Sequence, residues 1–67
     1  MIRINVFQTA PRSYWTVELV PENGKRVTLA KDAGGYEAED HVRHWSNKFD
    51  SSGEEYAVFR TECIGGS

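Results

Sequence analysis

The stretch YWTVELVPENGKRVTLA, residues 14–30, decides the fold class, because it has the pattern of two strands joined by a tight turn. In its first half every second residue is large and apolar: Trp15, Val17 and Leu19. This two-residue period is typical of a strand with one buried face. Asn23-Gly24 follows, and this dipeptide is a strong hairpin signal. The stretch therefore predicts an antiparallel hairpin with strands at Tyr14–Val20 and Lys25–Ala30.

The length of the hairpin loop is set by which side chains must share a face. A two-residue loop would pair Leu19 with Thr28 and so mix apolar and polar residues on each face. A three-residue loop, Glu22-Asn23-Gly24 with a left-handed Gly24, pairs Leu19 with Val27 and Val17 with Leu29, and it sets Glu18 opposite Thr28. Because a shift of one residue turns a whole strand over, burial favours the three-residue loop.

Three further elements are expected along the chain. Met1–Phe7 alternates as a first strand, and residues 8–13 form a loop around Pro11. A helix begins near Tyr36 or Glu37 and runs to about Lys48, with one narrow apolar stripe: Ala38, Val42, Trp45 and Phe49. Glu55–Thr61 is the last strand, and either Tyr56 and Val58 or Ala57 and Phe59 point inward.

The order β-β-β-α-β predicts an α+β fold. We expect one small domain, residues 1–64, with one mainly antiparallel sheet, one helix packed on one face, and a flexible tail at residues 65–67. A right-handed crossover would bring the last strand back parallel to the third. The expected core is Ile2, Ile4, Val6, Trp15, Val17, Leu19, Val27, Leu29, Val42, Trp45 and Phe49.

Composition narrows the class of protein. The 67 residues are 39% hydrophobic, enough for one compact core and too many for a disordered chain. No apolar run has the roughly 18 residues that a membrane span needs, and the N-terminal residues lack the apolar segment of a signal peptide. Cys63 is the only cysteine, whereas small secreted domains usually carry several. We therefore expect a cytoplasmic protein, not bound to a membrane, with a free thiol at Cys63.

The formal net charge of −2 hides an asymmetry along the chain. Residues 1–31 carry five basic and two acidic groups, whereas residues 32–55 carry seven acidic and two basic groups. Such polarity affects encounters with charged partners and does not set the fold. A nucleic-acid-binding domain usually has a strong basic excess, which this chain lacks.

Both histidines, His41 and His44, lie on one flank of the expected helix. Histidines three residues apart can share a metal, but zinc needs three or four ligands, and Cys63 is the only further soft ligand. Acids one turn earlier give three i,i+4 pairs that support a helix: Glu37–His41, Asp40–His44 and Glu39–Arg43. We therefore expect a solvated, charged helix face, with no metal and no cofactor.

No spacing of Ser, Thr, Cys and His residues suggests a nucleophile with its base, so we do not expect an enzyme. Two surfaces are candidates for binding. One is the acidic helix, with Glu37, Glu39, Asp40 and Arg43, extended by Asp50 and Glu54. The other is the uncovered sheet face, which would carry Arg3, Asn5, Phe7, Tyr14, Thr16, Glu18, Val20, Arg26 and Thr28. Its aromatic and arginine residues suit a protein interface or homodimer, a base-stacking platform, or an ordinary solvated surface.

The hairpin and the start of the helix also resemble a known family. Trp15, Leu19, Asn23, Gly24, Gly35 and Tyr36 match the pattern of YegP-type small bacterial domains of unknown function, and this resemblance implies a β-β-β-α unit. In size, charge and layout the chain is similar to phage-encoded inhibitors of the anti-CRISPR type. That similarity implies docking on a complex that handles nucleic acid.

Two function hypotheses follow. The first is a non-enzymatic, inhibitor-like module that binds another protein with a basic nucleic-acid-binding groove, through the acidic helix or the uncovered sheet face. The second is a weak nucleic-acid-binding domain that uses Phe7, Tyr14, Arg3 and Arg26.

Overall fold

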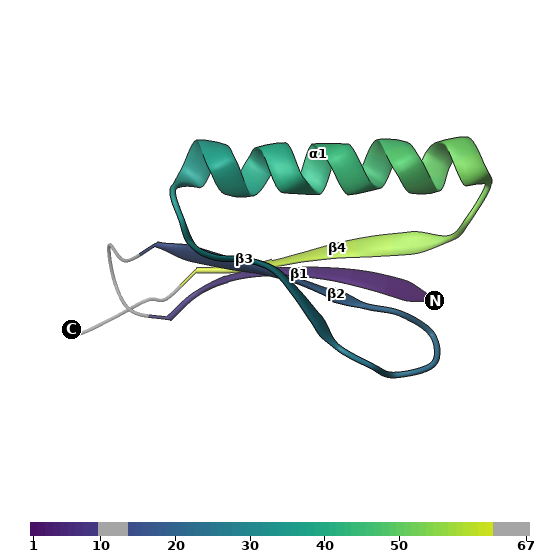
Figure 1. Cartoon of the computed structure of the whole chain (residues 1–67), viewed down its shortest axis with the longest axis horizontal. Helices are drawn as coiled ribbons and strands as arrows, with labels where there is room; N and C mark the ends of the chain where they lie inside the picture. The colour runs from purple at the N-terminus through teal and green to yellow at the C-terminus, as the bar shows by residue number, and fades with distance from the viewer. Residues whose placement is uncertain (10–13, 63–67) are drawn as a thin grey trace.

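One mixed sheet and one helix make up the fold in the computed structural model, which describes residues 1–9 and 14–62 (Figure 1). The elements are β1 (Ile2–Gln8), β2 (Trp15–Val20), β3 (Val27–Ala33), α1 (Gly35–Ser52) and β4 (Tyr56–Thr61). The strand order is β3-β2-β1-β4, and α1 lies across one face of the sheet. The predicted α+β class and β-β-β-α-β order are confirmed.

The position of β4 follows from its pairing. β1 is antiparallel to β2, β2 is antiparallel to β3, and β4 is parallel to β1. β4 therefore runs in the same direction as β3, as predicted, but it lies at the opposite edge of the sheet. The connection through α1 thus passes over β2 and β1, and both β3 and β4 are edge strands.

The hairpin has the predicted three-residue loop. Leu19 pairs with Val27 and Glu18 with Thr28. Gly24 has a φ of 91°, and its N–H donates to the Pro21 carbonyl at 3.0 Å. A type I turn followed by a left-handed residue is the usual form of such a loop.

The strand after the turn differs from its prediction in bounds and register. β3 begins at Val27 and continues to Ala33, beyond the expected end at Ala30. The register shifts twice along β2, so that Val17 faces Ala30 and not Leu29. Near its end, Asp32 adopts a φ of 57°. The added residues of a β-bulge bend a strand, and β3 reaches the start of α1 in this way.

The helix is longer than its apolar stripe alone predicted. It begins at Gly35, after an extended Gly34, and ends at Ser52. Gly53 follows with a φ of 72°, and its N–H donates to the Asp50 carbonyl at 3.2 Å, while the Glu54 N–H donates to the Phe49 carbonyl at 3.0 Å. This left-handed glycine cap places the helix end four residues beyond the predicted Lys48.

The core lies between α1 and the sheet. Its buried members are Ile4, Val6, Val17, Ala33, Ala38, Val42 and Phe49. Half-buried side chains surround them: Ile2, Trp15, Leu19, Leu29, Ala30, Trp45, Tyr56 and Val58. The prediction for Val27 is wrong, because this side chain is 50% exposed at the start of an edge strand.

The pairing of β4 with β1 shows which side chains of β4 face the helix. Ile4 is fully buried and pairs with Val58, so Tyr56 and Val58 face the helix. The Tyr56 ring packs on Phe49 with a centroid distance of 5.6 Å. Phe59 therefore lies on the uncovered face of the sheet.

Within residues 1–9 and 14–62, no helix is both long enough and apolar enough to cross a membrane. The predicted loop around Pro11, the thiol of Cys63 and the tail at residues 65–67 lie outside the described residues.

Candidate functional site

Glu39 joins the helix to β4 through an ion pair with Arg60. Its carboxylate accepts two hydrogen bonds from Arg60, Nε to Oε1 and Nη2 to Oε2, each at 3.0 Å. These bonds hold the pKa of Glu39 below its usual value and raise the pKa of Arg60. The pair lies beside an apolar hollow of about 230 Å³ that is lined by Val6, Trp15, Gly35 and Ala38.

The predicted Glu39–Arg43 pair is present only as a weaker electrostatic attraction: Arg43 helps to lower the pKa of Glu39, but the hydrogen bonds of Glu39 go to Arg60. The sequence did not predict the contact with Arg60, because it did not show where β4 lies in the sheet. Arg43 instead lies 4.0 Å from Asp40, and both side chains are 74% exposed. An exposed pair at this distance contributes little to stability, so Asp40 and Arg43 remain available at the surface.

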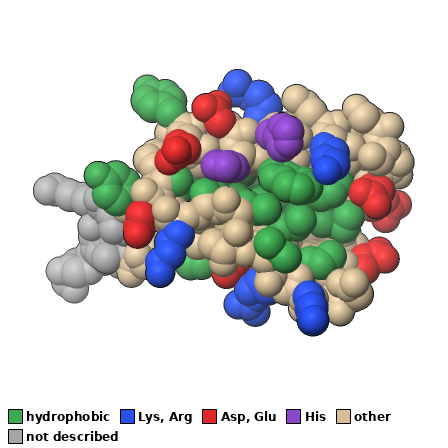
Figure 2. Space-filling view, viewed as in Figure 1, with side chains coloured by type: hydrophobic (Ala, Val, Ile, Leu, Met, Phe, Trp, Pro, Cys, Tyr) green, Lys and Arg blue, Asp and Glu red, His purple; other side chains and the backbone are tan. Residues whose placement is uncertain are grey.

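Glu37 and Asp40, the other acidic residues in the first half of the helix, line a groove between α1 and β3. It has a volume of about 500 Å³, and we call it the α1–β3 groove; its lining is Leu29, Glu37, Asp40, His41, His44 and Trp45. Figure 2 shows the two histidines in purple above the apolar surface that lies between helix and sheet. The groove thus has apolar side chains as its floor and titratable side chains along its rim.

The aromatic floor is held in place by its neighbours. Trp45 packs on Phe49 with a centroid distance of 5.8 Å, and the Lys48 ammonium lies 4.8 Å from the Trp45 ring centre. His44 meets Trp45 edge to face at 5.7 Å. Because Phe49 is buried in the core, these contacts give the groove a fixed floor.

The histidines do not form the predicted ion pairs with Glu37 and Asp40. In the described part of the chain, no carboxylate lies within 4.0 Å of either imidazole. Nor do the described residues include a group of three His, Cys, Asp or Glu side chains arranged to hold a metal. Sequence spacing placed both histidines correctly on one flank, and the structure adds that this flank faces a groove.

The uncovered sheet face carries the second set of predicted residues. Phe7 is half-buried there, Tyr14 is 62% exposed, and Arg26 lies 4.0 Å from Glu18. The sequence did not assign Phe59 to this face, yet its ring is 49% exposed and lies 6.0 Å from the Arg3 guanidinium carbon. The ambiguous alternation of β4 is the reason that Phe59 was missed.

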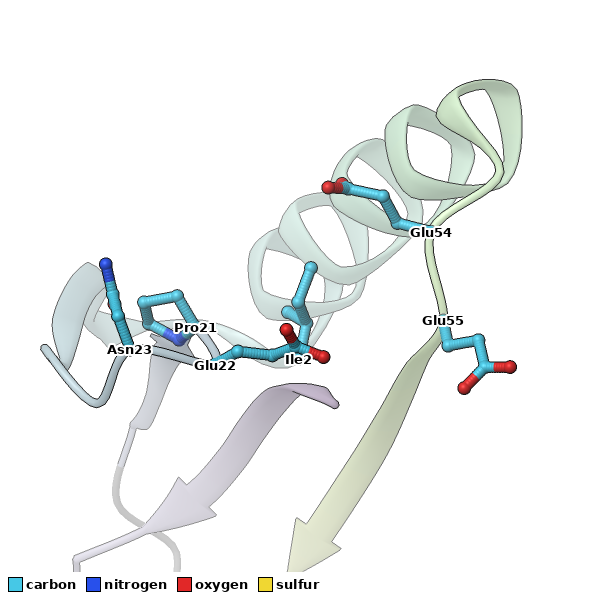
Figure 3. A pocket seen from close by; sticks show the side chains of 6 residues that line it. All are labelled: Ile2, Pro21, Glu22, Asn23, Glu54 and Glu55. Atoms are coloured by element: carbon cyan, nitrogen blue, oxygen red, sulfur yellow. The ribbon is translucent and has the colours of Figure 1, made fainter.

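A third hollow lies at the end of the molecule where the chain leaves the helix (Figure 3). It is lined by Ile2, Pro21, Glu22, Asn23, Glu54 and Glu55. Glu54 points across the hollow while Glu55 points away from it (Figure 3), and Glu22 pairs with the N-terminal ammonium at 3.0 Å. These carboxylates do not converge on one point, so the hollow has no organised ligand set.

No protein-family model matches the chain, and neither a curated protein nor a solved structure is significantly similar to it. The resemblances to YegP-type domains and to anti-CRISPR-type inhibitors therefore stay predictions from sequence.

Proposed function

We propose that this protein is a non-enzymatic module that binds another protein through the α1–β3 groove. The proposal rests mainly on the lining of the groove, where the apolar side chains of Leu29 and Trp45 lie beside the carboxylates of Glu37 and Asp40. Tryptophan is among the residues most enriched at the hot spots of protein interfaces.

The groove suits a partner surface that is rich in lysine and arginine, whose side chains combine a positive charge with apolar methylene groups. Lysine and arginine side chains can lay their methylene groups on Trp45 and Leu29 while their charged ends reach Glu37 and Asp40. A partner that handles nucleic acid presents such side chains. Occupation of its groove by carboxylates would then exclude phosphates, which is how an inhibitor of this kind would act in the cytoplasm.

A capture experiment with two matched charge reversals tests this proposal. The immobilised chain, a Glu37→Lys/Asp40→Lys variant and a Glu54→Lys/Glu55→Lys variant are incubated with extract of the native host, and retained proteins are identified. Both variants change the charge equally, but only the first alters the groove. We expect a basic partner that the wild type and the second variant retain, that the first variant loses, and that salt releases. Equal retention by all three proteins would reject the groove as the binding surface.

A second candidate function rests on the contact between Arg3 and Phe59. An arginine beside a half-exposed aromatic ring, with Phe7 on the same sheet face, is an arrangement on which unpaired bases stack. Glu18 lies on this face as well and opposes phosphate binding.

Fluorescence anisotropy with a labelled single-stranded DNA at low salt tests the second candidate. Binding that weakens at least about tenfold in Phe59→Ala would support it, because base stacking contributes about 1–3 kcal/mol per base. Absence of binding at high micromolar protein would reject it.

A further inference from the structure

The two edges of the sheet are built differently. β3 carries two register shifts and a left-handed Asp32, and its exposed side chains include Lys31. Bulges and charges of this kind discourage an edge strand from pairing with another chain. β4 pairs with β1 over six consecutive residue pairs without a shift. Its sequence YAVFRT contains no proline, and its one charged residue, Arg60, is bonded to Glu39 on the helix.

The outward backbone groups of β4 can be assigned from one hydrogen bond. The Ile2 N–H donates to the Glu55 carbonyl at 3.4 Å. In a parallel ladder the groups of alternate residues point to the same side, so Ala57 and Phe59 bond toward β1. The N–H and C=O groups of Tyr56, Val58 and Arg60 consequently point away from the sheet. None of the described strands pairs with this edge.

We infer that β4 is a homodimerisation edge, where it pairs antiparallel with β4 of a second copy, with Val58 facing Val58 of that copy. This register uses all three outward-facing residues and closes six backbone hydrogen bonds across a two-fold axis. Centring on Phe59 would leave the Tyr56 groups to pair with Glu62, beyond the end of the strand.

Complementarity of charge and shape favours a second copy of β4 over an unrelated strand. Antiparallel pairing sets Arg60 beside Tyr56 of the other copy, whose hydroxyl donates to Asp50 at 3.3 Å. It thereby brings the Arg60 guanidinium, which Glu39 of its own copy also binds, toward the Asp50 carboxylate of the other copy. On the uncovered face the same register places Phe59 opposite the small Ala57. A parallel pairing would instead place the Glu54-Glu55 ends together.

The helices do not obstruct this arrangement. α1 packs mainly over β2 and β3, and it meets β4 through side chains on the inward face of that strand, Tyr56 and Arg60, not at the outer backbone edge. With strands about 4.8 Å apart, two helices centred over β2 would lie about 24 Å from each other. A helix is about 10 Å wide, so the two would not collide. The dimer would have an eight-stranded sheet with both α1–β3 grooves open, and it is independent of the proposed function.

Sedimentation velocity of the full chain over a range from micromolar to millimolar concentration tests the dimer. We expect a monomer–dimer equilibrium that Val58→Pro weakens at least about tenfold, because proline removes an N–H that faces only the second copy. Circular dichroism checks that the variant is folded. A wild type that stays monomeric throughout the range would overturn the inference.

Disulfide trapping tests the register without relying on the proline variant. In a Cys63→Ser background, Val58→Cys should form a covalent dimer under mild oxidation, because its two copies would face each other within disulfide reach. Phe59→Cys is the matched control and should cross-link less, since it faces Ala57. Faster cross-linking of Phe59→Cys, or none in Val58→Cys, would overturn the proposed register.

Discussion

At the scale of single residues, the Glu39–Arg60 pair is the contact that ties the last strand to the helix. Both of its hydrogen bonds are 3.0 Å long, and they join residues that are 21 positions apart in the sequence. The side chains are about half exposed, so solvent screens the attraction. The pair therefore fixes geometry more than it adds stability.

A double-mutant cycle measures this contribution. Glu39→Gln, Arg60→Gln and the double variant should give a coupling free energy of about 0.5–1 kcal/mol by urea denaturation at pH 7. Glu37→Gln is the matched control, because Glu37 has no ion pair within the described residues. A coupling free energy of zero would mean that the pair does not hold in solution.

The same pair predicts a pH dependence. Arg60 holds the pKa of Glu39 below its usual value in the folded protein, so the pair stabilises the fold fully above the unfolded pKa of about 4.3. This contribution is lost as the pH falls through the lower, folded pKa. The difference in unfolding free energy between wild type and Glu39→Gln should accordingly be present at pH 7 and disappear near pH 2. A difference that grows on acidification would contradict this assignment.

At the scale of elements, the sequence predicted those features that depend on neighbouring residues in the chain. The hairpin loop and its Leu19–Val27 register follow from alternation and Gly24, and the structure confirms both. The position of β4 depends on which strand the crossover reaches, and its short sequence is apolar on both faces. For that reason its inward face, its partner β1 and the contact with Glu39 could not be predicted.

Phe49 and Val27 were both predicted to lie in the core, but they differ in how far they are buried. Phe49 is 5% exposed and contacts both Trp45 and Tyr56, whereas Val27 is 50% exposed. Phe49→Ala should lower the free energy of unfolding by about 3–5 kcal/mol, and Val27→Ala by about 0.5 kcal/mol or less. Thermal or urea denaturation of both variants checks this, and similar losses would contradict the position of β3.

The end of α1 depends on a left-handed glycine. Gly53 has a φ of 72°, which costs a residue with a Cβ about 1 kcal/mol. Gly53→Ala should therefore lower the free energy of unfolding by about that amount, although nothing obstructs its added Cβ. Gly35→Ala is the control, since Gly35 lies in the first turn of α1 without a positive φ, and its added Cβ would lie at an ordinary contact distance of 3.9 Å from Trp15 Nε1. Equal stabilities of the two variants would place the helix end elsewhere.

At the scale of the whole molecule, we propose three candidate contact surfaces: the α1–β3 groove, the uncovered sheet face and the β4 edge. Helical spacing predicted Glu37 and Asp40 as surface acids, but not that they border a groove. Leu29 and Trp45 were predicted as core, and their half-burial gives the groove its floor. The groove lies between α1 and β3, so its shape depends on the path of β3. That path follows from the β-bulges, which the sequence did not predict.

The proposed function rests on binding of a basic, partly apolar surface in the α1–β3 groove. Amide chemical-shift mapping of the labelled chain, titrated with a peptide of lysine and leucine residues, tests it most directly. We expect the shifts to concentrate at Leu29, His41, His44 and Trp45 and to vanish in the Glu37→Lys/Asp40→Lys variant. Shifts concentrated at Phe7 and Phe59 on the uncovered sheet face, or none at millimolar peptide, would contradict it.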